Sequence, residues 1–179
     1  MDNRFDTCLA FTLHEEGGFL DNRADPRGAT NLGITLARLR RFMREPNLGI
    51  DDIREIPHAT VCAIYLADFW NRARCDALPD GIDLMVFDHA VNAGPDRAAR
   101  ALQMAAGQKR SAQDGAVGQA TLAHVAEADP RSLLDALAET QRIGYRRMAA
   151  FGLFGDNWLA RLNRRHTKSQ DIARLVSAR

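Results

Sequence analysis

The sequence has few of the features that mark disulfide scaffolds, secreted precursors or membrane proteins. Its three cysteines, Cys8, Cys62 and Cys75, are too few and too scattered for a disulfide framework or a zinc finger. No apolar run approaches the roughly 20 residues of a membrane-spanning helix. The N-terminus also lacks a basic segment followed by an uninterrupted apolar stretch. We therefore expect synthesis in the cytoplasm without a signal peptide, and no stable membrane insertion.

Several catalytic motifs are absent as well. His14-Glu15-Glu16-Gly17-Gly18 begins like the zinc motif HExxH, but a glycine stands where the second histidine is required. The sequence contains neither the GxSxG of serine hydrolases nor the GxxxxGK that cradles phosphates. These absences argue against zinc, acyl-transfer and nucleotide chemistry, and we expect neither a metal nor a cofactor.

The composition is that of an ordinary globular protein, with 46% hydrophobic and 26% charged residues. The formal net charge of +1 hides an asymmetry, because residues 142–179 carry eight arginines and one lysine against two aspartates. This basic end faces either a polyanion at the cell envelope or only solvent, as most charged helix faces do. We expect residues 164–179 to form a basic tail, with no nucleic-acid partner.

The periodicity of apolar residues predicts a mainly helical fold. Turn-forming residues crowd the stretch from Phe19 to Thr35, which predicts a short β-like hairpin or loop after the first helix. The most apolar segment, 82–91, is expected to be a central buried helix whose Asp88 bonds to a nearby loop. The predicted helices are 3–16, 35–45, 57–74, 82–91, 95–106, 118–128 and 130–148, with further helical pieces around 158–162 and 171–176.

Two carboxylates near the N-terminus suggest glycosidic chemistry. Glu16 ends the first predicted helix before two glycines, and Asp25 lies nine residues later in a loop that could bring it across a groove. Hydrolysis of a glycosidic bond needs one carboxyl to protonate the leaving oxygen and a second to activate water or attack the sugar. On spacing alone, a helix C-cap and a turn explain the same residues better than catalysis does.

A family resemblance adds to this hypothesis. The stretch His14-Glu15-Glu16-Gly17-Gly18-Phe19, followed by Ala24-Asp25-Pro26-Arg27-Gly28-Ala29-Thr30-Asn31-Leu32-Gly33-Ile34-Thr35, closely resembles the signature of glycoside hydrolase family 108. Three further blocks are similar to that family in the same order: residues 70–107 with Val91-Asn92-Ala93-Gly94, Asp114-Gly115 to Thr121, and Phe154-Gly155 to Arg161. These enzymes are small bacterial and phage lysozymes that cut peptidoglycan between N-acetylmuramic acid and N-acetylglucosamine.

The resemblance implies roles for individual residues. The glutamate of the family's Glu-Gly-Gly maps onto Glu16 as the catalytic acid, with Glu15 as the only rival. By similarity to phage-type lysozymes, Asp25 and Thr30 would position water, and Asp21 is the alternative to Asp25. Arg27 departs from the family, which usually has glycine there; whether the reaction inverts or retains the anomeric centre stays open.

Five further residues are candidates for contact with the sugar. Aromatic rings stack on sugar faces and amides bond acetamido groups, which would place such residues in a cleft. Tyr65 and Trp70 more often belong to a core, and Asn92 more often helps to end a helix. The candidate substrate-binding residues are Phe19, Asn31, Tyr65, Trp70 and Asn92.

The sequence thus predicts a single lysozyme-like domain over residues 1–179. Residues 1–69 form its catalytic part, 70–163 resemble the family's peptidoglycan-binding region, and 164–179 form the basic tail. The predicted function is a monomeric muramidase whose partner is bacterial peptidoglycan. It would act in the periplasm or cell wall after release by a holin or a secretion machine. The alternatives are a lytic transglycosylase and a catalytically silent peptidoglycan-binding module.

Overall fold

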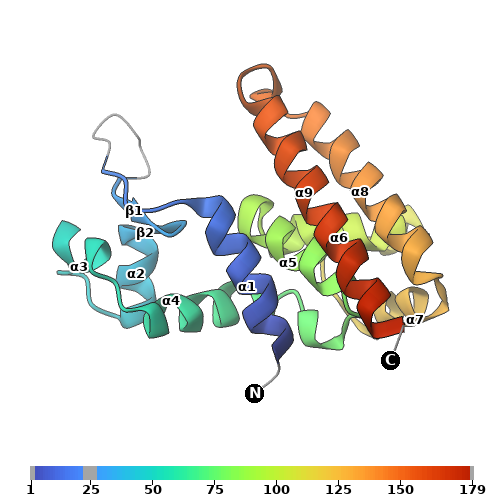
Figure 1. Ribbon diagram of the computed structural model, residues 1–179, viewed down its shortest axis with the longest axis horizontal. Coiled ribbons are helices and arrows are strands. Elements are labelled where there is room, and N and C mark those ends of the chain that lie inside the picture. Colours follow the sequence, from blue (N-terminus) through green and yellow to red (C-terminus); the bar gives the residue numbers. More distant parts are fainter. Residues whose placement is uncertain (1–2, 22–27, 178–179) are drawn as a thin grey trace. The chain divides into compact units, whose positions relative to one another are not determined.

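The structure, a computed structural model, describes residues 3–21 and 28–177 (Figure 1). The chain divides into two compact units, with the boundary between Asp68 and Phe69. Helices dominate both units, and within the described residues no helix is long and apolar enough to cross a membrane.

The first unit consists of short helices and one β-hairpin. Its elements are α1 (Asn3–Glu16), β1 (Thr30–Asn31), β2 (Ile34–Thr35), α2 (Leu36–Met43), α3 (Ile50–Arg54) and α4 (His58–Tyr65). Helix α1 buries Cys8, Leu9 and Thr12, which lie on one face at helical spacing. The helix ends at Glu16 because Gly17 takes a positive φ of 74°, a conformation that favours glycine.

The β-hairpin is short, with two residues in each strand and two in the turn. β1 pairs antiparallel with β2, with Thr30 opposite Thr35 and Asn31 opposite Ile34. The two residues between the strands, Leu32 and Gly33, both have positive φ, which is the geometry of a type I′ turn. The predicted hairpin after the first helix is therefore confirmed.

Helix α2 begins and ends close to its predicted limits. The Thr35 side chain accepts a hydrogen bond from the Arg38 backbone N–H at 3.1 Å, as an N-cap residue does. The helix ends at Met43 rather than Glu45, because Arg44 turns into the left-handed region with a φ of 58°.

Two features of the first unit differ from the sequence prediction. Helix α3 was not predicted; it spans only five residues, and Asp52 at its start accepts a hydrogen bond from the Gly49 N–H at 2.6 Å. The helix predicted for 57–74 is not regular, since α4 ends at Tyr65 and a π-helical turn, η1 (Leu66–Trp70), follows. This wider turn leaves the neighbours Phe69 and Trp70 both buried.

The second unit is a bundle around one apolar helix. Its elements are η2 (Cys75–Ala77), α5 (Ile82–Ala93), α6 (Pro95–Ala105), η3 (Arg110–Ala112), α7 (Gln119–Glu127), α8 (Pro130–Arg146) and α9 (Phe151–Ser177). Every residue of α5 from Ile82 to Ala90 is buried, and α6, α8 and α9 all pack against this helix. The prediction of a central buried helix at 82–91 is confirmed.

Helix α9 differs most from its prediction, because it is one continuous helix where two separate pieces were expected. Gly152 and Gly155 lie inside it, and a Cβ at Gly155 would come within 2.7 Å of the Phe151 ring. Residues 164–177, expected as a basic tail, are the C-terminal half of this helix, and Arg165 and Ser169 within them are fully buried.

Candidate active site

Glu16 is placed by the packing of α1. The buried Thr12 lies one helical turn before it, so Glu16 continues the face that α1 turns toward the interior of the first unit. Its side chain is half-buried, although the glycines that follow are exposed. The end of the helix thus presents a carboxyl group beside an open stretch of backbone.

The Glu16 side chain lies directly against the hairpin turn. A Cβ added at Gly33 would be 2.8 Å from Glu16 Oε2, 2.9 Å from Glu16 Cγ and 2.6 Å from the Tyr65 hydroxyl. Real Cβ atoms do not approach other atoms so closely, so only glycine leaves room for both side chains. The carboxyl of Glu16 and the hydroxyl of Tyr65 therefore meet at Gly33.

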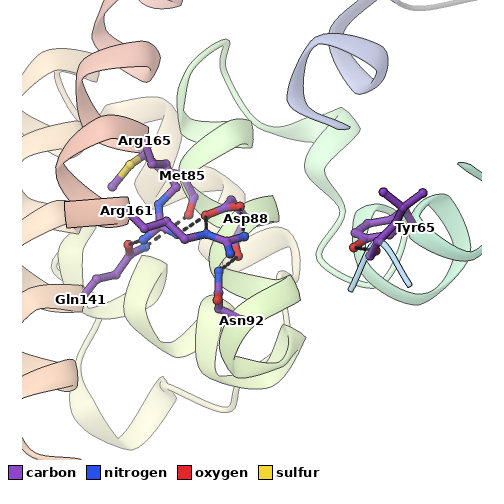
Figure 2. Close-up of polar contacts among 8 residues, drawn as sticks. Tyr65, Met85, Asp88, Asn92, Gln141, Arg161 and Arg165 are labelled. Carbon is purple, nitrogen blue, oxygen red and sulfur yellow. Dashed lines mark hydrogen bonds and ion pairs between the residues drawn. The ribbon is translucent and has the colours of Figure 1, made fainter. Parts of the chain in front are cut away.

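Tyr65 holds this turn in place. Its ring is fully buried, and its hydroxyl donates a hydrogen bond to the Leu32 carbonyl at 2.8 Å (Figure 2). Leu32 has a positive φ of 49°, which a residue with a branched side chain rarely adopts. Tyr65 was predicted as a sugar contact, and the structure gives it a supporting position behind the turn.

The second catalytic group is only partly described. Asp25 and Arg27 lie outside the described residues, whereas Thr30 is half-buried on β1 and Asp21 is exposed. Thr30 and Leu20 exchange two backbone hydrogen bonds, both 2.8 Å long. The described chain therefore brings Thr30 and the backbone preceding Asp21 side by side.

Phe19 and Asn31 connect this region to α3. Phe19 is half-buried, with the Arg54 guanidinium 4.8 Å from the centre of its ring. Asn31 is buried, and its amide donates to the carbonyls of Ile53 and Arg54 at 3.1 and 2.9 Å. Asn31 thus satisfies the C-terminal carbonyls of α3, a structural role that sequence reasoning did not foresee.

Trp70 and Asn92 belong to the second unit. Trp70 is buried, and its ring meets that of Phe87 edge-on at 5.5 Å, so it is a core residue. Asn92 is exposed on α5 and donates to the Asp88 carbonyl at 3.0 Å. Of the predicted residues, the described part of the first unit therefore brings together Glu16, Phe19, Thr30, Asn31 and Tyr65.

The core of the second unit contains a buried ion-pair network (Figure 2). Asp88 receives two hydrogen bonds from Arg161, at 2.6 and 3.1 Å, and one from Arg165 at 2.5 Å. Arg165 also donates to Gln141, whose amide in turn donates to the Met85 carbonyl. Burial alone would raise the pKa of Asp88, but the charges and hydrogen bonds of the two arginines outweigh it and hold that pKa below its usual value.

This network corrects the expected role of Asp88. Its partners lie on α9, about 75 residues along the chain, and not on a nearby loop. Neither arginine was singled out from the sequence, because Arg161 and Arg165 look like part of a solvated basic run. The two arginines are four residues apart, which puts both on one helix face, and this spacing was the only sequence pattern that could have indicated a shared partner.

His89 lies next to this network and remains neutral. Burial and the charge of Arg165 lower its pKa to about 3, with a further contribution from Arg97. Its ring packs edge-on against Tyr145 at 5.8 Å, and its buried Nδ1 has no hydrogen-bond partner among the described residues. The ring also lines a cavity of about 560 Å³ between α5, α6 and α8, whose walls include Met104 and Arg97.

The block from Asp114 to Thr121 has an internal role. The Asp114 carboxylate accepts hydrogen bonds from the Ala116 N–H and the Gln103 amide, at 2.9 and 2.7 Å. These bonds lower the pKa of Asp114, and Gln103 also accepts from the Gly115 N–H at 3.1 Å. The motif therefore shapes the loop before α7. Among the described residues, no group of His, Cys, Asp and Glu is arranged to hold a metal ion.

Comparisons with known proteins identify the family and the fold. Residues 9–94 match the family Glycosyl hydrolase 108. A solved structure, "Structure of Brucella abortus SagA", is 30% identical, covers 96% of this chain and 97% of its own, and superposes with a TM-score of 0.85. The chain belongs to the glycosyl hydrolase 108 family. Among curated proteins, none matches it.

Membership of the glycosyl hydrolase 108 family settles the class of the protein. It is a glycoside hydrolase of the peptidoglycan-degrading kind, and its fold is mainly helical and lysozyme-like. The matched segment contains Glu16, the hairpin and α4, and it extends through the whole of α5. The likeness to SagA extends over both units of this glycosyl hydrolase 108 protein.

Proposed function

We propose that the protein is a muramidase that cleaves the β-1,4 bond between N-acetylmuramic acid and N-acetylglucosamine, with Glu16 as the general acid. The observation that carries this proposal is the position of the Glu16 carboxyl, which lies at the end of α1 against Gly33 and beside the Tyr65 hydroxyl. The three atoms nearest to a Cβ added at Gly33 belong to Glu16 and Tyr65, and none of them belongs to the rival Glu15.

The proposed reaction begins with proton transfer. Glu16 gives its proton to the glycosidic oxygen, which leaves as the sugar bond breaks. The hairpin turn keeps the carboxyl in one position, since the Gly33 backbone lies against it and the Tyr65 hydrogen bond to Leu32 fixes that backbone. A fixed acid loses little entropy on reaching the transition state.

A water molecule completes the proposed reaction. Asp25 would hold or deprotonate this water and Thr30 would orient it, with Asp21 as the alternative to Asp25. Thr30 supports this assignment, because β1 presents its half-buried side chain in the same hairpin whose turn contacts Glu16. Phe19, half-buried under Arg54, is the aromatic residue that we propose for contact with a sugar face.

The test compares two adjacent glutamates. We expect Glu16→Gln to reduce cleavage of purified peptidoglycan by about 10²–10⁴-fold, the usual contribution of a general acid. Glu15→Gln is the matched control, since it makes the same change one residue earlier on the half-buried end of α1. Equal activity in the two variants would contradict the assignment of Glu16.

The chemistry of the product distinguishes the remaining alternatives. A muramidase leaves reducing N-acetylmuramic acid ends, whereas a lytic transglycosylase leaves 1,6-anhydro ends because the sugar's own hydroxyl replaces water. A catalytically silent module would bind the polymer and leave the glycan intact. Mass spectrometry of the released fragments separates these three outcomes.

We also propose that residues 70–163 bind peptidoglycan, and that the polymer binds at the cavity beside His89. The cavity combines apolar walls with Arg97 and Arg100, which together suit a ligand that has both apolar and anionic groups. In the inactive Glu16→Gln protein, Arg97→Gln should weaken retention on insoluble peptidoglycan. Arg110→Gln, an exposed arginine outside the cavity lining, is the control.

We propose that the protein acts as a monomer in the periplasm or cell wall. A holin or a secretion machine would release it there. Fractionation of producing cells, with and without such a release system, tests this part.

A further inference from the structure

The end of the α8–α9 hairpin exposes a cluster of large apolar side chains. Leu153 is 81% exposed and Phe154 50% exposed at the start of α9, and Ile143 and Met148 are exposed near the end of α8. Figure 1 shows the turn between these helices at the top of the view, where α8 and α9 meet. Large apolar side chains gathered at one turn usually mark a contact surface rather than chance exposure.

Positive charge predominates in the same segment. Residues 140–155 contain Arg142, Arg146 and Arg147 and neither aspartate nor glutamate, and the exposed Asp156 follows in the first turns of α9. Arg142 pairs with Glu139 at 2.6 Å, whereas Arg146 and Arg147 form no ion pair with any described residue. The hairpin end therefore presents two uncompensated guanidinium groups beside four exposed apolar side chains.

Aromatic stacking fixes the apolar part of this surface. The Phe154 ring lies 6.0 Å from that of Trp158, which in turn lies 5.8 Å from the buried Tyr145. Phe154 is thus held at the surface by a half-buried tryptophan instead of folding inward. A fixed apolar group loses less conformational entropy on binding than a mobile one.

We propose that the α8–α9 hairpin end binds an anionic phospholipid surface. A bilayer interface offers both partners that this surface needs, a layer of phosphates for the arginines and a hydrocarbon boundary for Leu153 and Phe154. Peptidoglycan supplies carboxylates but few apolar groups larger than a methyl, and nucleic acid supplies phosphates without hydrocarbon. The binding is peripheral, with the side chains entering the interface and no helix crossing it.

This surface is separate from the proposed active site and does not rest on it. Ile143, Arg147 and Met148 also line the cavity beside His89, whereas Leu153 and Arg146 lie outside its lining. Variants at these two positions should therefore cleave purified peptidoglycan at the rate of the unaltered protein. A failure of the membrane proposal and a failure of the muramidase proposal can then be told apart.

The experiment measures co-sedimentation of the full chain with vesicles. We expect binding to vesicles of phosphatidylglycerol and phosphatidylcholine, loss of binding as salt is raised, and little binding to phosphatidylcholine alone. Arg146→Gln should weaken binding roughly fivefold, and Leu153→Asn should weaken it roughly tenfold.

Two matched variants serve as controls. Leu175→Asn changes another exposed leucine of α9, which is 67% exposed, and Arg110→Gln removes another exposed arginine. Both should bind like the unaltered protein, and unchanged circular dichroism should show that all four variants are folded. A blue shift of tryptophan fluorescence on binding that is lost in Trp158→Phe would locate the contact at this end of the hairpin.

Three results would overturn the proposal. The first is equal binding to anionic and neutral vesicles, or to neither. The second is an equal loss of binding in Leu153→Asn and Leu175→Asn. The third is a chain that self-associates without vesicles and becomes monomeric on Leu153→Asn, because the surface would then be an interface between two copies.

Discussion

At the residue scale, Gly33 is the position on which the proposed site depends most. Its φ of 74° completes the hairpin turn, and its missing side chain leaves the space into which Glu16 and Tyr65 both extend. Backbone conformation and close approach thus both require glycine at the same residue.

Gly33→Ala should lower both stability and activity. The new Cβ would strain the turn and displace Glu16 or Tyr65, at a cost of about 1–3 kcal/mol in the free energy of unfolding. Gly28→Ala is the matched control, since its φ is 71° but no atom lies within 4 Å of the added Cβ. Denaturant unfolding and peptidoglycan cleavage should both separate the two variants; equal losses would show that contact with Glu16 and Tyr65 is unimportant.

His89 should make stability depend on pH. An unfolded histidine takes up a proton below about pH 6.5, but the folded one stays neutral until the pH approaches its lowered pKa of about 3. Between these values the unfolded state binds more protons, so the free energy of unfolding should decrease as the pH is lowered, by up to about 1.4 kcal/mol per pH unit.

His89→Leu should flatten this pH dependence. Chemical denaturation between pH 4 and pH 7 measures the slope, and His14→Leu, which removes an exposed histidine of α1, is the control. A slope unchanged in His89→Leu would mean that other groups cause the acid sensitivity.

The sequence predicted single residues well where a local motif determines their environment. Glu16 at the helix end and Thr35 as an N-cap both follow from their immediate neighbours. The position of Tyr65 behind the turn, and that of Asn31 against α3, depend on contacts more than 20 residues away. Such contacts leave no local pattern, so sugar binding and structural support could not be distinguished for these two residues.

At the element scale, α9 shows how a surface-like sequence can be part of the core. Its basic residues suggest a solvated tail, yet Arg165 is fully buried and binds the equally buried Asp88. The charge pattern along one helix does not reveal a partner on another helix, which is why the tail was predicted in its place. Cap residues and glycines, in contrast, predicted most helix ends within a few residues.

Removing residues 164–179 should unfold the second unit. The deletion takes away Arg165 and leaves the Asp88 carboxylate buried with one fewer cation, a change that costs about 3–5 kcal/mol for a buried pair. A deletion of residues 176–179 is the control, because it keeps Arg165 and Ser169. Thermal unfolding followed by circular dichroism compares the two; equal melting temperatures would mean that this half of α9 is dispensable.

At the scale of the whole molecule, the chain consists of two compact units with different functional features. The first contains Glu16 and the hairpin, and the second contains the buried ion-pair network, the cavity and the exposed hairpin end. The mainly helical, lysozyme-like fold was predictable because caps, glycines and apolar periodicity agree along the chain. The ordered motifs likewise predicted the family, to which the match over residues 9–94 assigns the chain.

The measurement that tests the account most directly is mass spectrometry of fragments released from purified peptidoglycan by the unaltered protein, Glu16→Gln and Glu15→Gln. The account predicts fragments with reducing N-acetylmuramic acid ends from the unaltered protein and from Glu15→Gln, and almost none from Glu16→Gln. Reducing ends released by Glu16→Gln at the normal rate would contradict the role of Glu16. Anhydro ends, or an intact glycan in every sample, would contradict the muramidase itself.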